Sequence, residues 1–549
     1  MPEKLEQVCR TVLGKITPEK KERAKIEALA EKLLKKVTVA SKEFGVKSTV
    51  RLEGSVAKDT WLSGEPDIDV FMRLPKTIPR ASLGDVSLRI ARKAARDSKQ
   101  IERFAEHPYL EAVVDKTRVN IVPCYDVKKG EWLSATDRTP FHTDYVKQRL
   151  TEQMRGEVRL LKKFMKGIGV YGAEIKIGGF SGYLCELLIL HYGSFENTLK
   201  SFAQHRQRIV VDIENYYEDR ENELGLLFKE PLVIVDPVDK GRNVASAVQP
   251  QKLYTLVAAS RAFLKKPSLS FFYPPETKPL SAQEMKRKLE KRGSALVFLT
   301  FGKVDVVPDI LWGQLYKSQR SLRKLIQIND FRLLRDFVWS DEQTVNMFVF
   351  ELEARNLSSV KKHLGPPLDK ESECEKFLKK HLYNSGTVSG PYIEDGRWVV
   401  EVQRRYTDAV ALLKDKLGDG GRNAGAAEQI SRKLRKGFKV FVNGEIVEVY
   451  RKNREFAKML TEFLSGRPKW LETTETERYQ QCAEHPCVER EVMKPLRGKY
   501  SLQQFQGKIA HEHGGNYSGC KLSVAYSSGR EHGSFLIESQ SQRSEYGWD

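Results

Sequence analysis

The apolar positions of the first 150 residues change their spacing several times, and each change predicts an element. They recur every three or four residues over 1–44, which predicts helix, whereas residues 48–53 and 66–74 read as strands. A basic helix is predicted over 83–98. Two further strands then meet in a turn at residues 115–116. We therefore expect a small mixed sheet backed by helices.

Beyond residue 139 the periodicity is helical, and strong helices are predicted over 157–167, 180–192 and 253–264. Residues 236–245 interrupt them as an extended segment that runs into a turn. From residue 267 strands alternate with helices, which is typical of an α+β domain. The predicted elements there are strands at 295–300, 344–352 and 398–402, and helices at 311–331, 371–381, 410–417 and 428–436.

These changes of pattern divide the chain into four parts and predict a multidomain α+β protein. Residues 1–150 form the sheet-containing part, residues 151–266 a helical part, and residues 267–466 an α+β part with basic helices. Residues 467–549 are rich in Gln, Ser, Gly and Glu and show little periodicity. We expect them to form an appended, weakly ordered extension of unknown role.

The chain carries a large positive charge. Among 549 residues, 93 Lys and Arg stand against 73 Asp and Glu, and the excess of +20 is spread along the sequence. A distributed basic surface indicates a polyanionic partner, with nucleic acid first among the candidates, although simple solubility would also account for it. The 40% share of hydrophobic residues favours folded cores over disorder.

The cysteines and the N-terminus indicate a compartment. Seven cysteines are scattered without a paired framework, which fits a reducing cytosol. The first residues lack the apolar core of a signal peptide. No stretch approaches the roughly 18 uninterrupted apolar residues of a membrane span. We therefore expect a cytoplasmic protein with no membrane partner.

The stretch from residue 54 to residue 71 combines a phosphate turn with a pair of carboxylates. Asp67 and Asp69 stand two apart on a predicted strand, so both carboxylates face the same side. Such a pair suits a hard cation such as Mg²⁺, which also binds phosphates. Gly54-Ser55 can present backbone N–H groups and a hydroxyl to a phosphate. The alternative is an Asp-x-Asp pair on a solvated strand edge, which is common.

A third acid is harder to find. Two-metal sites that clamp an attacking hydroxyl and a leaving pyrophosphate use another carboxylate on a neighbouring strand. The strand in the right place, residues 117–125, carries Asn120 there. An amide oxygen can ligate a cation but brings no charge and cannot accept a proton. Asp115 would face the other side of a continuous strand, and Asp126 lies beyond Pro123, so neither is a clean substitute.

Several basic or aromatic residues could contact a nucleotide. Three basic residues could hold a triphosphate, namely Lys58, Lys162 and Arg242, although the sequence alone favours a solvated surface charge for each of them. His142 could do the same or serve as a core or capping histidine. Tyr171 lies between glycines, so its ring could stack on a base or cap a helix.

A group of Cys and His residues near the C-terminus offers zinc ligands. Its Cys-x₄-Cys spacing is looser than the Cys-x₂-Cys of most zinc ribbons, which leaves zinc binding open. The residues are Cys482, His485, Cys487, His511, His513 and Cys520.

Motifs spread over residues 1–465 resemble the archaeal (class I) CCA-adding enzymes, tRNA nucleotidyltransferases of the polymerase-β superfamily. The match is long enough to indicate the family rather than the superfamily. It is carried by Gly54-Ser55, Asp67-Ile68-Asp69-Val70-Phe71, Ala105-Glu106-His107-Pro108-Tyr109, Val122-Pro123-Cys124-Tyr125, Asp137-Arg138-Thr139-Pro140-Phe141-His142, Arg159-Leu160-Leu161-Lys162, Tyr171-Gly172-Ala173-Glu174, Gly179-Phe180-Ser181-Gly182-Tyr183-Leu184-Cys185-Glu186, Tyr192-Gly193-Ser194-Phe195, Asp236-Pro237-Val238-Asp239, Arg242-Asn243-Val244-Ala245 and Gly396-Arg397-Trp398.

The resemblance implies a fold of head, neck, body and tail, usually as a homodimer. It implies addition of C, C and A to tRNA 3′ ends from CTP and ATP, with Mg²⁺, release of pyrophosphate and no template. The body and tail would bind tRNA from its acceptor stem to its elbow, largely by shape and phosphate contacts. The head would correspond to residues 1–150, the neck to 151–266, and the body and tail to 267–466.

The resemblance also implies roles for single residues. Asp67 and Asp69 match metal-binding carboxylates, and Arg242 matches an arginine that reads the incoming base. The nucleotide-contacting positions are matched by Ser55, Lys58, His142, Lys162 and Tyr171.

Two positions depart from the family pattern. Lys58 replaces an arginine, which keeps the charge but loses the bidentate fork. Asn120 stands at the third catalytic carboxylate. A second hypothesis is therefore a catalytically weakened tRNA-binding paralogue. A third is another transferase of the superfamily, such as a poly(A) polymerase, although the motifs beyond residue 150 argue against it.

Overall fold

The computed structural model of the chain describes residues 2–104, 106–205, 207–471, 522–526 and 535–539. They belong to two units, residues 1–472 and 473–549. In the second unit, β15 (Leu522–Tyr526) and β16 (Phe535–Ser539) pair as an antiparallel hairpin. The rest of the expected extension beyond residue 471, including all the Cys and His residues considered for zinc, lies outside the described residues.

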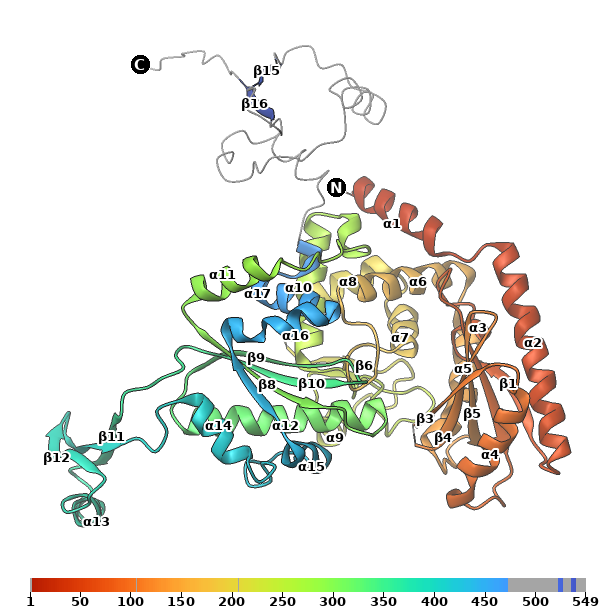
Figure 1. The fold of residues 1–549 in the computed structure, drawn as a ribbon. Coiled ribbons are helices and arrows are strands. Elements are labelled where there is room, and N and C mark those ends of the chain that lie inside the picture. Colours follow the sequence, from red (N-terminus) through yellow and green to blue (C-terminus); the bar gives the residue numbers. More distant parts are fainter. Residues whose placement is uncertain (1, 105, 206, 472–521, 527–534, 540–549) are drawn as a thin grey trace. The chain divides into compact units, whose positions relative to one another are not determined.

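A five-stranded sheet in the order β1-β2-β5-β4-β3 organises the N-terminal part of the first unit (Figure 1). β2 and β5 run parallel, and the other neighbouring pairs are antiparallel. The elements are α2 (Lys20–Glu43), β1 (Thr49–Glu53), α3 (Gly54–Ala57), β2 (Asp67–Leu74), α4 (Arg80–Ala94), β3 (Lys99–Phe104), β4 (Pro108–Val114) and β5 (Thr117–Tyr125).

One face of this sheet is apolar and is covered by α2 and α4. Ile68 and Val70 of β2 and Val119 and Ile121 of β5 are fully buried in the core that these helices share. Because strand side chains alternate, the polar residues between them project from the opposite face. The fold thereby places the predicted metal ligands away from the core.

Most elements of this sheet were predictable from the local pattern. The predicted turn between two strands is confirmed: Asp115 and Lys116 have φ values of 49° and 65°, the left-handed conformation that tight hairpins use. The predicted helix over 83–98 is shifted to Arg80–Ala94, directly after Pro79. β3 was not predicted, because none of its residues is buried and it therefore lacks an apolar alternation.

Residues 139–273 are mainly helical and pack around an aromatic core. The ring of Phe164 lies 5.5 Å from that of Phe195 and 5.3 Å from that of Phe263. Val12 of α1 (Pro2–Ile16) is buried in this core rather than in that of the sheet. The elements are α5 (Thr139–Arg149), α6 (Glu152–Gly167), α7 (Gly182–Tyr192), α8 (Phe195–Ala203), β6 (Ile209–Val211), α9 (Glu221–Leu227), β7 (Leu232–Ile234) and α10 (Pro250–Lys265).

A four-stranded sheet in the order β14-β8-β10-β9 follows, with one apolar core on each face. This part is α+β, as predicted. Its elements are α11 (Ala282–Arg292), β8 (Ala295–Gly302), α12 (Pro308–Ile328), β9 (Leu333–Ser340), β10 (Val345–Leu352), α14 (Ala409–Leu417), α15 (Glu428–Lys436), β14 (Lys439–Val442), α16 (Val447–Lys452) and α17 (Arg454–Ser465).

Residues 357–407 form a small insertion in this part, here called the projection (Figure 1). Its sheet has the order β11-β13-β12, built from β11 (Val360–Pro367), β12 (Thr387–Glu394) and β13 (Arg397–Gln403), with α13 (Glu371–His381) beside it. The Leu357 N–H donates to the carbonyl of Thr407 at 2.8 Å, so its two ends lie together.

The first unit extends slightly past the boundary predicted at residue 466. Trp470 is buried, and its ring stacks on that of Phe271 with 5.3 Å between centroids. Among the residues that the structure describes, no helix is both long and apolar enough to span a membrane.

Candidate active site

The predicted carboxylate pair and Asn120 lie side by side on the polar face of the head sheet. Because β2 and β5 are parallel and in register, Asp67 lies opposite Arg118 and Asp69 opposite Asn120. The Asn120 side-chain amide donates to Asp69 Oδ1 at 2.9 Å. The Arg118 guanidinium binds Asp67 through two hydrogen bonds, with Nε donating to Oδ1 at 2.8 Å. Both carboxylates thus face N–H donors.

Gly54 lets the chain turn directly against Asp69. Its φ is +71°, and a Cβ placed there would lie 1.9 Å from Asp69 Oδ2. No other residue can therefore occupy this position without moving the carboxylate. Ser55 follows in the short helix α3, and its carbonyl accepts from the Thr60 N–H at 2.9 Å. This hydrogen bond closes the turn that lies next to the carboxylates.

The electrostatic environment of Asp67 and Asp69 favours the binding of a positive charge. Burial, and to a smaller extent the charge of Asp67, raise the pKa of Asp69 to about 6, against the Asn120 hydrogen bond and Lys58, which lower it. Within the described residues, no three His, Cys, Asp or Glu side chains are grouped to hold a metal. Two carboxylates plus substrate phosphates are nevertheless a donor set that divalent cations use. The residues present therefore fit a divalent cation that is completed by substrate.

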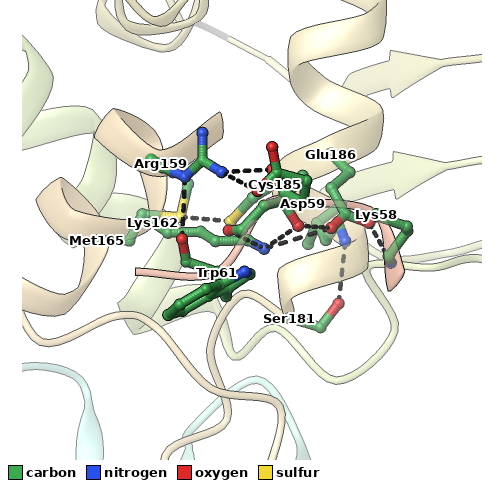
Figure 2. Close-up of polar contacts among 11 residues, drawn as sticks. Lys58, Asp59, Trp61, Arg159, Lys162, Met165, Ser181, Cys185 and Glu186 are labelled. Atoms are coloured by element: carbon green, nitrogen blue, oxygen red, sulfur yellow. Dashed lines mark hydrogen bonds and ion pairs between the residues drawn. The ribbon is translucent and has the colours of Figure 1, made fainter. Parts of the chain in front are cut away.

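Lys58 and Lys162 meet at a buried glutamate that the sequence analysis did not single out (Figure 2). Glu186 of α7 forms ion pairs with both ammonium groups, at 3.3 Å for Lys162, and accepts from Thr60 Oγ1 at 2.6 Å. All four side chains are buried. Two lysines against one glutamate leave a net positive charge, which suits a polyanion.

The pKa values of this cluster follow from its burial. Burial alone would raise the pKa of Glu186, but the two ammonium groups outweigh it and lower that pKa. Burial lowers the pKa of Lys162 against the attraction of Glu186, and the charge of Lys58 lowers it further. The cluster is therefore held together by charge in a place that excludes water.

Arg159 fixes the loop that carries Thr60 (Figure 2). Its Nε donates to the carbonyl of Trp61 at 2.9 Å, and its terminal nitrogen donates to both the carbonyl and the carboxylate of Asp59 at 2.6 Å. Asp59 has a φ of +52° and is also paired with Arg23. This conformation is unfavourable for a residue with a side chain, so these contacts hold it in place.

His142 and Arg242 meet at a second buried carboxylate. Asp236 Oδ2 lies 2.9 Å from His142 Nε2 and accepts from Arg242 at 2.7 Å, while Tyr183 donates to Oδ1 at 3.1 Å. Burial would raise the pKa of Asp236, but His142, Arg242 and the Val238 N–H lower it to about 2. Burial lowers the pKa of His142.

One aromatic ring connects the two clusters. Tyr183 stacks on the His142 ring, with 4.1 Å between centroids, and Lys58 Nζ lies 5.7 Å from the Tyr183 ring centroid. Tyr171 lies close by: a Cβ on Gly182 would be 3.1 Å from its hydroxyl and 3.5 Å from the Lys162 ammonium. The N-terminal turn of α7 thus joins most of the predicted nucleotide contacts.

Three site residues are not predicted from the sequence, although each lies in a motif that resembles the family: Glu186, Asp236 and Tyr183. A signal did exist for Glu186. It is the one charged residue in the otherwise apolar run from Leu184 to Leu190, and a buried carboxylate requires a partner. For Asp236 and Tyr183 the local pattern gives no such indication.

Models of protein families match three parts of the chain. Residues 17–150 match a model of the nucleotidyltransferase domain. Residues 156–273 match the second domain of tRNA nucleotidyltransferase, and residues 292–443 match the C-terminal domain of CCA-adding enzymes. The sheet with its carboxylates and these matches define a nucleotidyltransferase with a mixed head sheet in a multidomain α+β chain.

Curated relatives identify the family. A CCA-adding enzyme of Methanosarcina barkeri is 40% identical over 80% of this chain and 95% of its own length. Those of Methanothermobacter thermautotrophicus and Halobacterium salinarum are 36% and 35% identical, and the matches cover 97% and 95% of their lengths. The chain belongs to the family of archaeal-type CCA-adding enzymes.

Proposed function

We propose that this chain adds and repairs the 3′-terminal CCA of tRNA from CTP and ATP, without a template and with release of pyrophosphate. Membership of the family is the observation that carries this function: the match covers nearly the whole length of enzymes so named. The net charge of +20 supports tRNA as the polyanionic partner.

We further propose that Asp67 and Asp69 hold Mg²⁺ together with the phosphates of the substrate. The cation would supply neutralisation of the charge that develops at the α-phosphate. Arg118 would move off Asp67 and the Asn120 N–H group would turn away from Asp69 Oδ1 when both carboxylates serve as ligands, because a cation repels the guanidinium and the N–H group that now point at these oxygens. Gly54 has no Cβ, so the turn that carries Ser55 can lie directly against Asp69.

The nucleotide would lie between these carboxylates and the N-terminal turn of α7. Lys58 and Lys162 would face the triphosphate with the excess positive charge of their cluster, and Ser55 would bind it by its hydroxyl or backbone. Tyr171, close to the Lys162 ammonium, and His142 would line the same place. Arg242 would present donors to the base of CTP or ATP, and its ion pair with Asp236 orients the guanidinium.

We also propose that the body and the projection bind tRNA from acceptor stem to elbow, that the protein is a homodimer and that it works in the cytoplasm. The dimer rests on the family resemblance, and light scattering tests it. The cytoplasm is supported by the cysteines: Cys9, Cys124, Cys185 and Cys374, all in the described part, are unpaired.

The function is tested by extension of a tRNA that lacks CCA. With Mg²⁺ and CTP alone we expect addition of two C residues and then arrest, and with CTP and ATP we expect complete CCA ends by sequencing. The Asp67→Ala variant should add nothing and still bind tRNA. If the parent protein binds tRNA with the usual salt dependence but adds no nucleotide, the weakened paralogue is the correct description.

A further inference from the structure

Asn120 has a carboxylate neighbour on its other side. In the register of β4 and β5, Glu111 lies directly opposite Asn120, just as Asp69 does on β2. Directly opposed side chains on one face have Cβ atoms about 4.5–5.5 Å apart. The amide of Asn120 therefore stands in a row between two carboxylates, Asp69 and Glu111, on the polar face of the sheet.

The Glu111 carboxylate faces this site rather than the apolar core. It accepts from Arg103 of β3 at 3.2 Å and 3.0 Å. The pKa of Arg118 is raised by its hydrogen bond to Asp67 first, and the charge of Glu111 also contributes. A carboxylate offers about four acceptor positions, and Arg103 occupies two of them. Glu111 thus keeps acceptor capacity beyond its pair with Arg103, directly across the strand pair from Asn120.

An asparagine amide is useful to a cation in only one of its two orientations. In the structure the Asn120 N–H group donates to Asp69, so the amide oxygen points away from Asp69. A cation on Asp69 would repel that N–H group and attract the oxygen. The side-chain amide must then rotate by about half a turn, about a torsion that is broad and nearly two-fold. After this rotation its N–H group needs another acceptor.

We propose that Glu111 is a positioning residue, which accepts the Asn120 N–H group when the amide oxygen turns toward a divalent cation held by Asp67 and Asp69. The inference rests on the metal site proposed above. Glu111 would also contribute the negative charge that an aspartate at position 120 would have supplied, one strand further away. In this way the site can work with an amide where the sequence analysis expects a third carboxylate.

Glu53 is the other buried carboxylate in the same row, and it does not fit this task. It lies opposite Asp69 on β1, on the far side from Asn120. Its carboxylate is ion-paired with Arg51 at 3.0 Å, and its other main influences are Thr143 and Asp144 of α5. Glu111 is therefore the carboxylate that can orient the amide.

Binding of Mn²⁺ alone, followed by electron paramagnetic resonance of the free ion, tests this role without turnover. Glu111→Leu removes both charge and acceptor, whereas Glu111→Gln removes the charge and keeps an oxygen. With Asn120 present, we expect Glu111→Leu to weaken Mn²⁺ binding about tenfold more than Glu111→Gln does. In the Asn120→Asp background no amide needs orienting, so the two substitutions should agree within about twofold, the precision of such cycles.

A matched control separates position from overall charge. Glu102 stands on β3 opposite Leu110, on the other face of the sheet, and its side chain is exposed and paired with Arg92. Glu102→Leu should leave Mn²⁺ binding unchanged. Thermal unfolding of every variant verifies that the fold is kept, since Arg103 can reach solvent when Glu111 is removed.

The outcomes distinguish the inference from the proposed metal site. If Glu111→Leu and Glu111→Gln differ in Mn²⁺ affinity by the same factor with Asn120 and with the Asn120→Asp substitution, the positioning role is overturned. Damage to the fold would give this result, because it does not depend on residue 120. A parent protein that binds Mn²⁺ no better than Asp67→Ala would overturn the metal site, and the inference with it. A gap confined to the Asn120 background supports both.

Discussion

At the scale of single residues, the site is built from charges that compensate one another in pairs and triplets. Glu186 is fully buried between Lys58 and Lys162, so its removal leaves two ammonium groups facing each other. Asp67 is paired in the same way with Arg118, whereas Asp69 accepts a hydrogen bond from the neutral amide of Asn120. Each of these groups predicts what a substitution will do.

Glu186→Gln should destabilise the protein and make it depend on nucleotide. Breaking a buried ion pair costs about 3–5 kcal/mol, so the melting temperature should fall. CTP should then raise the melting temperature of this variant more than that of the parent, because the triphosphate replaces the lost negative charge.

Glu351→Gln is a suitable control for that comparison. Glu351 is equally buried and is held by Arg292 and Arg335, but it lies on β10 of the four-stranded sheet. This variant should melt earlier and show the same CTP-induced shift as the parent. An equal shift in Glu186→Gln would contradict the placement of the triphosphate beside Lys58 and Lys162.

Asn120→Asp should accelerate nucleotide transfer. The substitution restores a carboxylate beside Asp69, which adds negative charge for a cation and a group that can accept a proton. We expect at least about a tenfold higher rate of the chemical step, since a group that supports a metal site contributes about 10–100-fold and a positioned general base about 10²–10⁴-fold. Single-turnover extension at saturating Mg²⁺ measures it. A slower rate would indicate that the neighbouring Glu111 makes a second acid unfavourable.

At the scale of elements, the turn from β1 to α3 controls how close the chain comes to the carboxylates. Gly54→Ala should abolish addition, because its Cβ meets Asp69 at 1.9 Å. Gly64→Ala is the matched control: its φ of +76° is similar, but nothing lies within 4 Å of the new Cβ. Both variants lose about 1–2 kcal/mol of folding free energy for the left-handed backbone. Equal activities of the Gly54→Ala and Gly64→Ala variants would refute the close approach of the chain to Asp69.

Local patterns predict the elements of this site but not its contacts. The strand at 66–74 follows from the spacing of apolar residues, and the turn at residues 115–116 follows from the residue types found there. The burial of Lys58 depends on Glu186, 128 residues away, and that of His142 on Asp236, 94 residues away. In sequence, Lys58 and Lys162 resemble solvated surface charges, because no local pattern indicates a partner so far along the chain.

At the scale of the whole molecule, we expect the net charge and the projection to govern how tRNA binds. The excess of +20 predicts that the logarithm of the tRNA affinity falls linearly with the logarithm of salt concentration. The projection exposes aromatic and apolar side chains, including Tyr383 at 92% and Ile393 at 57% exposure. Such side chains can stack on unpaired bases at the tRNA elbow.

Removal of residues 357–407 tests this surface. The two ends of the projection are joined by a hydrogen bond of 2.8 Å, so a short glycine linker can close the gap. Affinity for full-length tRNA should fall about tenfold or more, the effect of losing one or two stacking contacts. The KM for CTP on an acceptor-stem minihelix should not change. Unaltered affinity for full-length tRNA would place the elbow contact elsewhere.

We propose that two carboxylates and an amide form a working nucleotidyl-transfer site. Its most direct measurement is the single-turnover addition of A to a tRNA that ends in CC, for the parent, Asn120→Asp and Asp67→Ala in parallel. We predict a measurable rate for the parent, a faster one for Asn120→Asp and none for Asp67→Ala. A parent rate indistinguishable from that of Asp67→Ala, with Asn120→Asp active, would show that the site with Asn120 does not transfer nucleotides.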